Sequence, residues 1–238
     1  MNETVESMLT FARGPLFRFT FALMVLGLVR LVLLTVYRAA YTYMRAGDMR
    51  LLWPVIRQRT LWWLFPFGRF KRTRAVYSII SFVFHVGLII VPIFLFAHVY
   101  LWKRGIGISW PALPPLAADV LTIITVVAAV ALFAGRVGSQ VSRTLSRAQD
   151  YTWPVLLMVP FVSGFFASHP TWCPVDYHVM LLIHILSAEL IFVMIPFSKI
   201  AHCVLIPFSQ LVSDLGWRFP ATAGRDVAKA LGKESVPI

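Results

Sequence analysis

Cysteine and acidic residues are scarce in this chain, and each scarcity excludes a class of site. The 238 residues include two cysteines, Cys173 and Cys203, and no Cys-x-x-Cys-His segment. Covalent haem attachment is therefore excluded, and the thiolates are too few to hold an iron–sulfur cluster. Aspartate and glutamate together number 10 against 22 lysine and arginine residues, which gives a formal net charge of +12.

Charge of either sign is low for a chain of this length. Charged residues make up 13% of the sequence and hydrophobic residues 59%, whereas a soluble domain has about 25% charged residues. Five apolar stretches come close to the ~20 residues that a bilayer core requires: about 17–41, 76–102, 115–135, 152–168 and 177–211. Unpaired backbone groups are costly in lipid, so the sequence predicts an all-α integral membrane protein with five transmembrane helices.

The basic residues lie mainly in alternate connections, which predicts topology rather than nucleic-acid binding. Eight lie between the first two stretches, three between the third and fourth, and four after the fifth, whereas the opposite connections hold only Lys103 and Arg104. The positive-inside rule then places the N-terminus outside and the C-terminus in the cytoplasm. We expect an outer segment at 1–13, a membrane domain at 14–211 and a cytoplasmic tail at 212–238.

Two segments depart from this alternation of spans and polar connections. Residues 1–10 contain two glutamates and no lysine or arginine, which is not the start of a cleavable signal peptide, so the first stretch is expected to remain as a span. Residues 51–70 are rich in tryptophan but interrupted by Arg57 and Arg59. We expect them to lie in the inner membrane interface.

Four histidines lie inside the apolar stretches: His85 and His98 in the second, His184 and His202 in the fifth. An imidazole in hydrocarbon requires a hydrogen-bond or metal partner. Four imidazoles at two depths are the number needed to ligate two haem irons from both axial sides. The alternative is that each histidine is a structural residue bonded to a neighbouring carbonyl.

Helix geometry predicts how the four histidines pair. His184 and His202 are 18 residues apart, which is five turns and roughly 27 Å on a continuous helix, so both lie on one face near opposite membrane surfaces. The second stretch runs the other way, so His85 pairs with His202 at the inner side and His98 with His184 at the outer side. His85 and His98 are about 140° apart on an ideal helix, and we expect Pro92 to distort the helix and correct this. His178 is the reserve candidate for His184.

Other polar residues in the apolar stretches are candidates for contacts with haem propionates. Arg30 and Glu189 are expected at similar depths, so they are predicted to be coupled, directly or through a propionate; the alternative for Arg30 is snorkelling along its helix. The other propionate candidates are Ser198 and Lys199 before His202, and Arg136, which could equally be a positive-inside flank.

At these histidines the chain resembles the respiratory nitrate reductase gamma subunit family. The segment Phe84-His85-Val86-Gly87 with Ala97-His98 is similar to that family's second span, and Ile195-Pro196-Phe197-Ser198-Lys199-x-x-His202 is similar to the end of its last span. The similarity covers about 72–207, and the four histidines match the family's ligands. The spacing within the second span is longer than in nitrate reductase, and the quinol-site lysine of the family has no clear counterpart. Sulfite-reductase-linked and heterodisulfide-reductase-like membrane cytochromes are related.

The resemblance implies a dihaem cytochrome b in a prokaryotic cytoplasmic membrane, with two non-covalent b haems. Quinol or menaquinol would be oxidised beside the outer haem, where His98, Lys103 and Arg104 are the candidate binding residues. Electrons would pass to a cytoplasmic-side iron–sulfur or molybdenum-containing catalytic subunit, so the chain would be an electron-transfer subunit rather than the terminal catalytic one. Two alternatives remain: the same cytochrome working in reverse as a quinone reductase, or a haem-free membrane anchor or transporter subunit.

Overall fold

The computed structural model describes residues 3–46, 50–64, 75–216 and 219–234. These residues are mainly helical and contain no strands; one isolated bridge pairs Ala46 with Pro220. Five helical stretches are long and apolar enough to cross a membrane: Glu3–Arg45, Ala75–Phe94, Pro115–Gly138, Ala148–Ser168 and Tyr177–Phe197. The predicted class, an all-α membrane protein with five spans, is confirmed at this level, and the chain is a multi-pass membrane protein.

The chain divides into two compact units. Unit 1 contains the described parts of 1–23 and 66–194, and unit 2 those of 24–65 and 195–238. The helix α2 (Phe17–Arg45) runs from one unit into the other, and α9 (Tyr177–Met194) ends where unit 2 resumes. Each unit is described by itself below.

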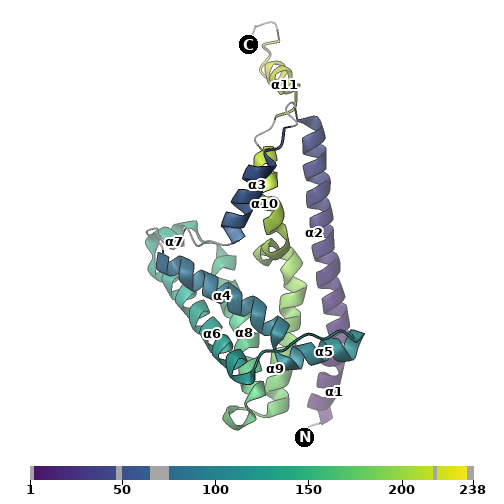
Figure 1. Cartoon of the computed structure of the whole chain (residues 1–238), viewed down its shortest axis with the longest axis vertical. Helices are drawn as coiled ribbons and strands as arrows, with labels where there is room; N and C mark the ends of the chain where they lie inside the picture. Colours follow the sequence, from purple (N-terminus) through teal and green to yellow (C-terminus); the bar gives the residue numbers. More distant parts are fainter. Residues whose placement is uncertain (1–2, 47–49, 65–74, 217–218, 235–238) are drawn as a thin grey trace. The chain divides into compact units, whose positions relative to one another are not determined.

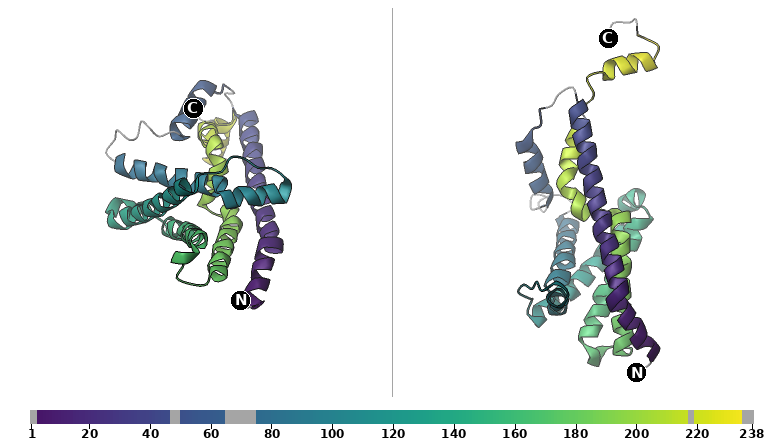
Figure 2. Two further views of the ribbon diagram at one scale, coloured as in Figure 1. Left: turned by 60° about the horizontal axis from the view of Figure 1, so that its bottom comes forward. Right: turned by 90° about the vertical axis from the view of Figure 1, so that its right-hand side faces the viewer.

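Unit 1 is built on four packed helices. In it α6 (Pro115–Gly138) packs against both α4 (Ala75–Phe94) and α8 (Ala148–Ser168), and α8 packs against α9. Figures 1 and 2 show these helices side by side. The core between α4 and α6 contains Phe84, Ala128, Ala129 and Leu132. Small alanines on α6 allow close approach of α4, which is how membrane helices pack without a hydrophobic driving force.

Gly87 lies where α4 approaches α6. A Cβ atom at this position would overlap Oγ1 of Thr125 and lie 3.0 Å from its Cβ. The Thr125 hydroxyl donates to the carbonyl of Leu121 at 2.6 Å, so its polar group is satisfied within α6. Glycine is therefore required here by the helix crossing.

The N-terminal helices also belong to unit 1. The helix α1 (Glu3–Phe11) continues through a π-helical turn, η1 (Ala12–Leu16), into α2. Pro15 lies in that turn, where its missing N–H and its ring disturb regular α-helical bonding. Both α1 and η1 pack against α9, and Phe17 and Phe21 contact Phe192 with ring centroids 6.1 Å apart. The continuous helical stretch that contains the first predicted span therefore runs from Glu3 to Arg45, beyond the predicted 17–41 at both ends.

The second span is shorter than the predicted 76–102. The helix α4 ends at Phe94, Leu95 is extended (φ −65°, ψ 132°), and a separate helix α5 (Phe96–Ile106) follows. The distortion predicted from Pro92 is confirmed as a break three residues later. The break frees three carbonyls, and each finds another donor: Pro92 accepts from His98 Nδ1, Ile93 from Trp110 Nε1 and Phe94 from the Leu113 N–H.

The fifth span is also interrupted, so the prediction of one helix at 177–211 is wrong. After α9 come two 3₁₀ turns, η4 (Ile195–Phe197) and η5 (Lys199–Ala201), with Ser198 extended between them, and then α10 (His202–Gly216). Pro196 lies in the first of these turns. Because the helix is not continuous, the five-turn argument that placed His184 and His202 on one face does not hold.

Unit 2 contains these turns, α10, the later part of α2 and two short helices. The helix α3 (Trp53–Leu64) packs against α10, and α11 (Ala223–Ala230) follows. Gly27 of α2 lies against Pro196, since a Cβ at 27 would be 2.6 Å from the Cβ of that proline. The tryptophan-rich segment predicted at 51–70 contains α3, while 65–70 lie outside the described residues. The predicted tail start at 212 falls inside α10.

Candidate outer haem site

The structure brings His98 and His184 together, as the pairing predicted. His98 comes from the first turn of α5 and His184 from the middle of α9. Their ring centroids are 6.0 Å apart and the ring planes are within 11° of parallel. Offset-stacked rings have centroids about 4.5–7 Å apart, so the two imidazoles lie side by side at the separation of such a pair. The spacing suits one atom bound between a nitrogen of each ring.

The two rings are held in the same way. His98 Nδ1 lies 2.9 Å from the carbonyl oxygen of Pro92, and His184 Nδ1 lies 2.8 Å from that of Pro160. A carbonyl oxygen can only accept, so each Nδ1 carries its hydrogen and each Nε2 carries the lone pair. Metal-ligating histidines are typically oriented by such a bond from the other ring nitrogen. Within the described chain, neither Nε2 has a hydrogen-bond partner.

Gly164 on α8 makes room for the His184 ring. A Cβ atom at position 164 would lie 2.8 Å from Cε1 and 2.9 Å from Nδ1 of His184. Any larger residue would displace the imidazole or break its bond to Pro160, one turn earlier on the same helix. The ring position is thus set by a carbonyl and by a missing side chain, both supplied by α8.

These features fit an axial haem site. Two neutral imidazoles with Nε2 unbonded, a fixed tautomer and nearly parallel rings form a suitable donor set for a bis-histidine iron. Within the described residues, no group of three or more His, Cys, Asp or Glu side chains could hold a bare metal ion. Bis-histidine haem ligation takes two side chains.

The predicted inner ligands lie in different units. His85 is in α4 of unit 1, with Nδ1 2.6 Å from the Ser81 carbonyl oxygen, and His202 begins α10 of unit 2, with Nδ1 2.7 Å from that of Lys199. Each Nδ1 is therefore hydrogen-bonded to a carbonyl, as in the outer pair. The pairing of His85 with His202 stays a prediction.

The candidate propionate contacts fall into two groups. Arg30, Ser198 and Lys199 belong to unit 2; the first and last are exposed, and the Ser198 hydroxyl accepts from the Ile200 N–H at 3.3 Å at the start of η5. Their propionate roles stay predictions. Arg136 belongs to unit 1 and is part of a polar network.

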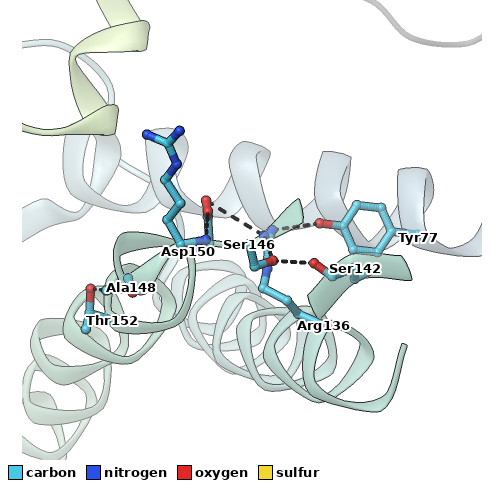
Figure 3. Close-up of polar contacts among 8 residues, drawn as sticks. Tyr77, Arg136, Ser142, Ser146, Ala148, Asp150 and Thr152 are labelled. Atoms are coloured by element: carbon cyan, nitrogen blue, oxygen red, sulfur yellow. Dashed lines mark hydrogen bonds and ion pairs between the residues drawn. The ribbon is translucent and has the colours of Figure 1, made fainter. Parts of the chain in front are cut away.

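That network, which we call the arginine clamp, consists of Tyr77, Arg136, Ser146 and Asp150 (Figure 3). Arg136 donates to the Ser146 hydroxyl at 3.0 Å and the Tyr77 hydroxyl at 3.2 Å, and its Nη1 lies 3.7 Å from Asp150 Oδ1. Asp150 also accepts from the Arg147 N–H and so caps α8. The clamp ties together the ends of α4, α6 and α8, a role that the sequence did not indicate.

Lys103 and Arg104, the predicted quinol-site cations, are exposed in the last turn of α5. Cations there interact favourably with the helix dipole. Their role in quinol binding stays a prediction.

Sequence reasoning missed a second group of residues in unit 1. His169 lies with Nε2 3.3 Å from Oδ2 of Asp119, and its ring packs against those of Phe165 and Trp172. The signal for Asp119 was its position as the one acidic residue in the otherwise apolar stretch 115–135.

Glu189 is buried in α9, with 3% of its surface exposed. Neither carboxyl oxygen has a hydrogen-bond partner among the described residues. Its predicted coupling partner, Arg30, is exposed and belongs to unit 2, whereas Glu189 belongs to unit 1. The coupling of the two residues stays a prediction.

Comparison with known proteins adds one relative. A protein of Nitratidesulfovibrio vulgaris (strain Hildenborough) is 34% identical over 154 residues, which is 64% of this chain and 67% of the relative. That relative is named only "Protein", which states no activity. No family model matches the sequence, and no solved structure matches it.

Proposed function

The chain belongs to the same family as the Nitratidesulfovibrio vulgaris protein, and from its own residues we propose that it is a dihaem cytochrome b that oxidises quinol. It would be the membrane subunit of a respiratory oxidoreductase in a prokaryotic cytoplasmic membrane. Electrons would pass through two b haems to a cytoplasmic-side iron–sulfur or molybdenum-containing catalytic subunit. The observation that carries the proposal is the His98–His184 pair.

In the proposed outer site, the residues of this chain hold and orient the group. His98 and His184, with ring centroids 6.0 Å apart, would each offer an Nε2 lone pair, and the Pro92 and Pro160 carbonyls fix both tautomers. Bound there, a haem would supply a one-electron acceptor without an open coordination position, which favours electron transfer over oxygen or substrate chemistry. Because these anchors belong to the backbone, the rings need little reorganisation to bind it.

The proposed inner site uses His85 and His202, with Arg30, Ser198 and Lys199 as propionate contacts. Its support is the pattern of the outer pair: each imidazole donates from Nδ1 to a carbonyl. The arginine clamp already occupies Arg136, so we place the inner propionates chiefly on the unit 2 residues.

The basic connections support the proposed orientation, with the N-terminus outside and the C-terminus in the cytoplasm. Quinol oxidation at the outer side would then release protons outside while electrons move inward. The same residues would serve quinone reduction, because direction depends on haem potentials set by surroundings beyond the ligands.

The test is the haem content of the purified full-length protein and of histidine variants. We expect two haems per chain, one after replacing His98 or His184 by alanine, and still one when both are replaced, because the two residues ligate the same iron. His202→Ala should remove the other haem. His178→Ala is the matched control and should keep both.

Two results would contradict the proposal. Absence of a reduced-minus-oxidised haem spectrum in the wild-type protein would favour a haem-free anchor or transporter. Loss of one haem in each single variant but of both haems in the His98/His184 double variant would show that these residues do not share an iron.

A further inference from the structure

We propose that Asp119 and His169 form the proton-exchanging dyad of a quinone site, with Phe165 and Trp172 as the surface on which the quinone ring stacks. The inference rests on the proposed function and deepens it. It assigns to the quinol reaction two residues for which the sequence indicated no role.

The dyad joins two helices at one end of unit 1. Asp119 lies in the first turns of α6, and His169 follows the last residue of α8. Nε2 of His169 is 3.3 Å from Oδ2 of Asp119, and Nδ1 is 2.9 Å from the carbonyl oxygen of Phe165. The Phe165 carbonyl can only accept, so Nδ1 carries its hydrogen and Nε2 is the basic nitrogen. A proton taken up at Nε2 lies against the carboxylate.

The dyad is partly open. The side chains of His169 and Asp119 are 24% and 33% exposed, so a hydroxyl can reach the carboxylate and a proton can leave to water. Within the described chain, Asp119 is the charged group in contact with His169; the other ring contacts are Phe165 of α8 and Trp172 of η3 (Pro170–Trp172), which are uncharged. Proton exchange at His169 therefore depends chiefly on Asp119.

The aromatic residues provide an apolar surface next to the dyad. The His169 ring lies 4.5 Å from the Phe165 centroid and 5.2 Å from that of Trp172, and the planes of His169 and Trp172 are within 11° of parallel. Trp172 remains 66% exposed, so one of the largest apolar faces in this region is uncovered. Quinone rings are planar and apolar with polar groups at both ends, which suits stacking on an aromatic face with a hydrogen bond at the edge.

The dyad is close along the chain to a residue that shapes the proposed outer haem site. Gly164, which makes room for the His184 ring, directly precedes Phe165. From Gly164 to His169 is five residues, or roughly 7.5 Å along α8. One helix therefore positions both the iron ligand and the proton acceptor.

The reaction balances as follows. Each quinol O–H bond breaks, its proton passes to Asp119 and is shared with His169 Nε2, and the bonding electrons stay on the quinol. A haem held by His98 and His184, as in the proposed function, would supply the one-electron acceptor for the two electrons that the quinol loses in turn as it becomes quinone. The two protons leave the dyad in turn for the aqueous phase. In the reverse direction the protonated dyad donates to a quinone carbonyl.

The first experiment measures binding without electron transfer. A water-soluble naphthoquinone is titrated into the oxidised full-length protein while quenching of tryptophan fluorescence is recorded. Asp119→Asn and His169→Gln should each weaken binding about tenfold, as expected for loss of one hydrogen bond involving a charged group. Trp172→Phe should remove the quenching component. Asp176→Asn and His178→Gln, which change an acid and a histidine at the start of α9, are the matched controls.

The pH dependence gives a second readout. A quinone accepts from the protonated dyad and a quinol donates to the deprotonated one, so naphthoquinone binding should tighten on acidification and naphthoquinol binding on alkalinisation. Both trends should flatten in Asp119→Asn and His169→Gln, with wild-type haem content. Unchanged affinity and pH dependence in both variants would overturn the dyad. Absence of haem in the wild type would instead overturn the proposed function, whatever the quinone affinity.

Discussion

The polar side chains at the two ends of unit 1 differ in how their hydrogen-bonding groups are satisfied. At one end, the arginine clamp joins α4, α6 and α8 through the contacts of Arg136. At the other end, which we call the histidine end and define by His98, Asp119, His169 and His184, ring nitrogens are oriented by backbone carbonyls. Nε2 of His98 and of His184 has no protein hydrogen-bond partner within the described chain.

The difference separates a structural role from a functional one. A side chain whose donors are bonded to protein groups fixes helix positions, and replacing it should change stability. An imidazole whose Nδ1 is hydrogen-bonded to a carbonyl, and whose Nε2 is thereby oriented but unbonded, is preorganised for a ligand. Substitutions at the two ends of unit 1 are therefore expected to have different effects.

The largest effect is expected from Gly164→Ala, in which the added methyl group would take the space of the His184 ring. The added Cβ would lie 2.8 Å and 2.9 Å from atoms of the His184 ring, so the imidazole must move and its bond to Pro160 must lengthen. We expect one of two haems to be lost, as in His184→Ala, measured by haem content per chain. Gly138→Ala has no atom within 4 Å of its Cβ and should keep both haems. Full outer-haem occupancy in Gly164→Ala would contradict this role for α8.

The second-largest effect is expected at the crossing of α4 and α6, between the two ends of unit 1. Gly87→Ala would place a Cβ in overlap with Oγ1 of Thr125 and push α4 from α6. Overpacking of this kind costs about 1–3 kcal/mol, which thermal unfolding in detergent should detect. Adding Thr125→Ala should restore part of the stability by removing the hydroxyl. Gly135→Ala, without a neighbour within 4 Å of its Cβ, is the control. Equal losses of thermal stability in Gly87→Ala and Gly135→Ala would refute the crossing argument.

At the clamp end the effect should be smaller and confined to stability. Arg136→Lys removes the planar fork that reaches several partners at once, at a cost of about 1 kcal/mol. Tyr77→Phe should cost less, and a double-mutant cycle should show coupling between the two. Both variants should retain wild-type haem spectra. A shifted spectrum in Arg136→Lys but not in Tyr77→Phe would instead support the predicted propionate contact.

The smallest effect is a pH-dependent one at the start of α9. Asp176 accepts from the His178 N–H at 2.9 Å and the Val179 N–H at 3.4 Å, and the bond from His178 above all lowers the pKa of its carboxyl. A lowered pKa in the folded state means that the stabilisation is present above the ordinary aspartate range and is lost as pH falls through the lowered value. Asp176→Ala should therefore be less stable than wild type at neutral pH, and the difference should shrink below about pH 4. A difference that persists unchanged in acid would show that the cap does not depend on the charge.

The sequence predicted five spans because length and apolarity are properties of each segment alone. It predicted the partnership of His98 with His184, and the ring separation of 6.0 Å supports it. The argument for His202 depended on a continuous helix, and the turns around Pro196 and Ser198 removed that basis. The second predicted span is not a single helix, because the backbone is extended at Leu95; Pro92 had indicated a distortion in this region.

Periodicity could not find the contacts that join distant segments. Asp119 and His169 are 50 residues apart, and nothing local in either stretch indicates the other. Gly164 appears in the sequence as one small residue in an apolar run, and its purpose is visible only with the His184 ring beside it. Arg136 matched a positive-inside flank, and that description does not include its bonds to Tyr77 and Ser146.

The sequence by itself determined that the chain is a multi-pass helical membrane protein, because the apolar segments must bury their backbone groups within themselves. It also determined which histidines lie in those segments. Only the tertiary structure decided which side chains meet, since that depends on where helices break and how closely they cross. The breaks freed the Pro92 carbonyl for His98, and the close packing of α8 on α9 gave His184 its carbonyl and its space.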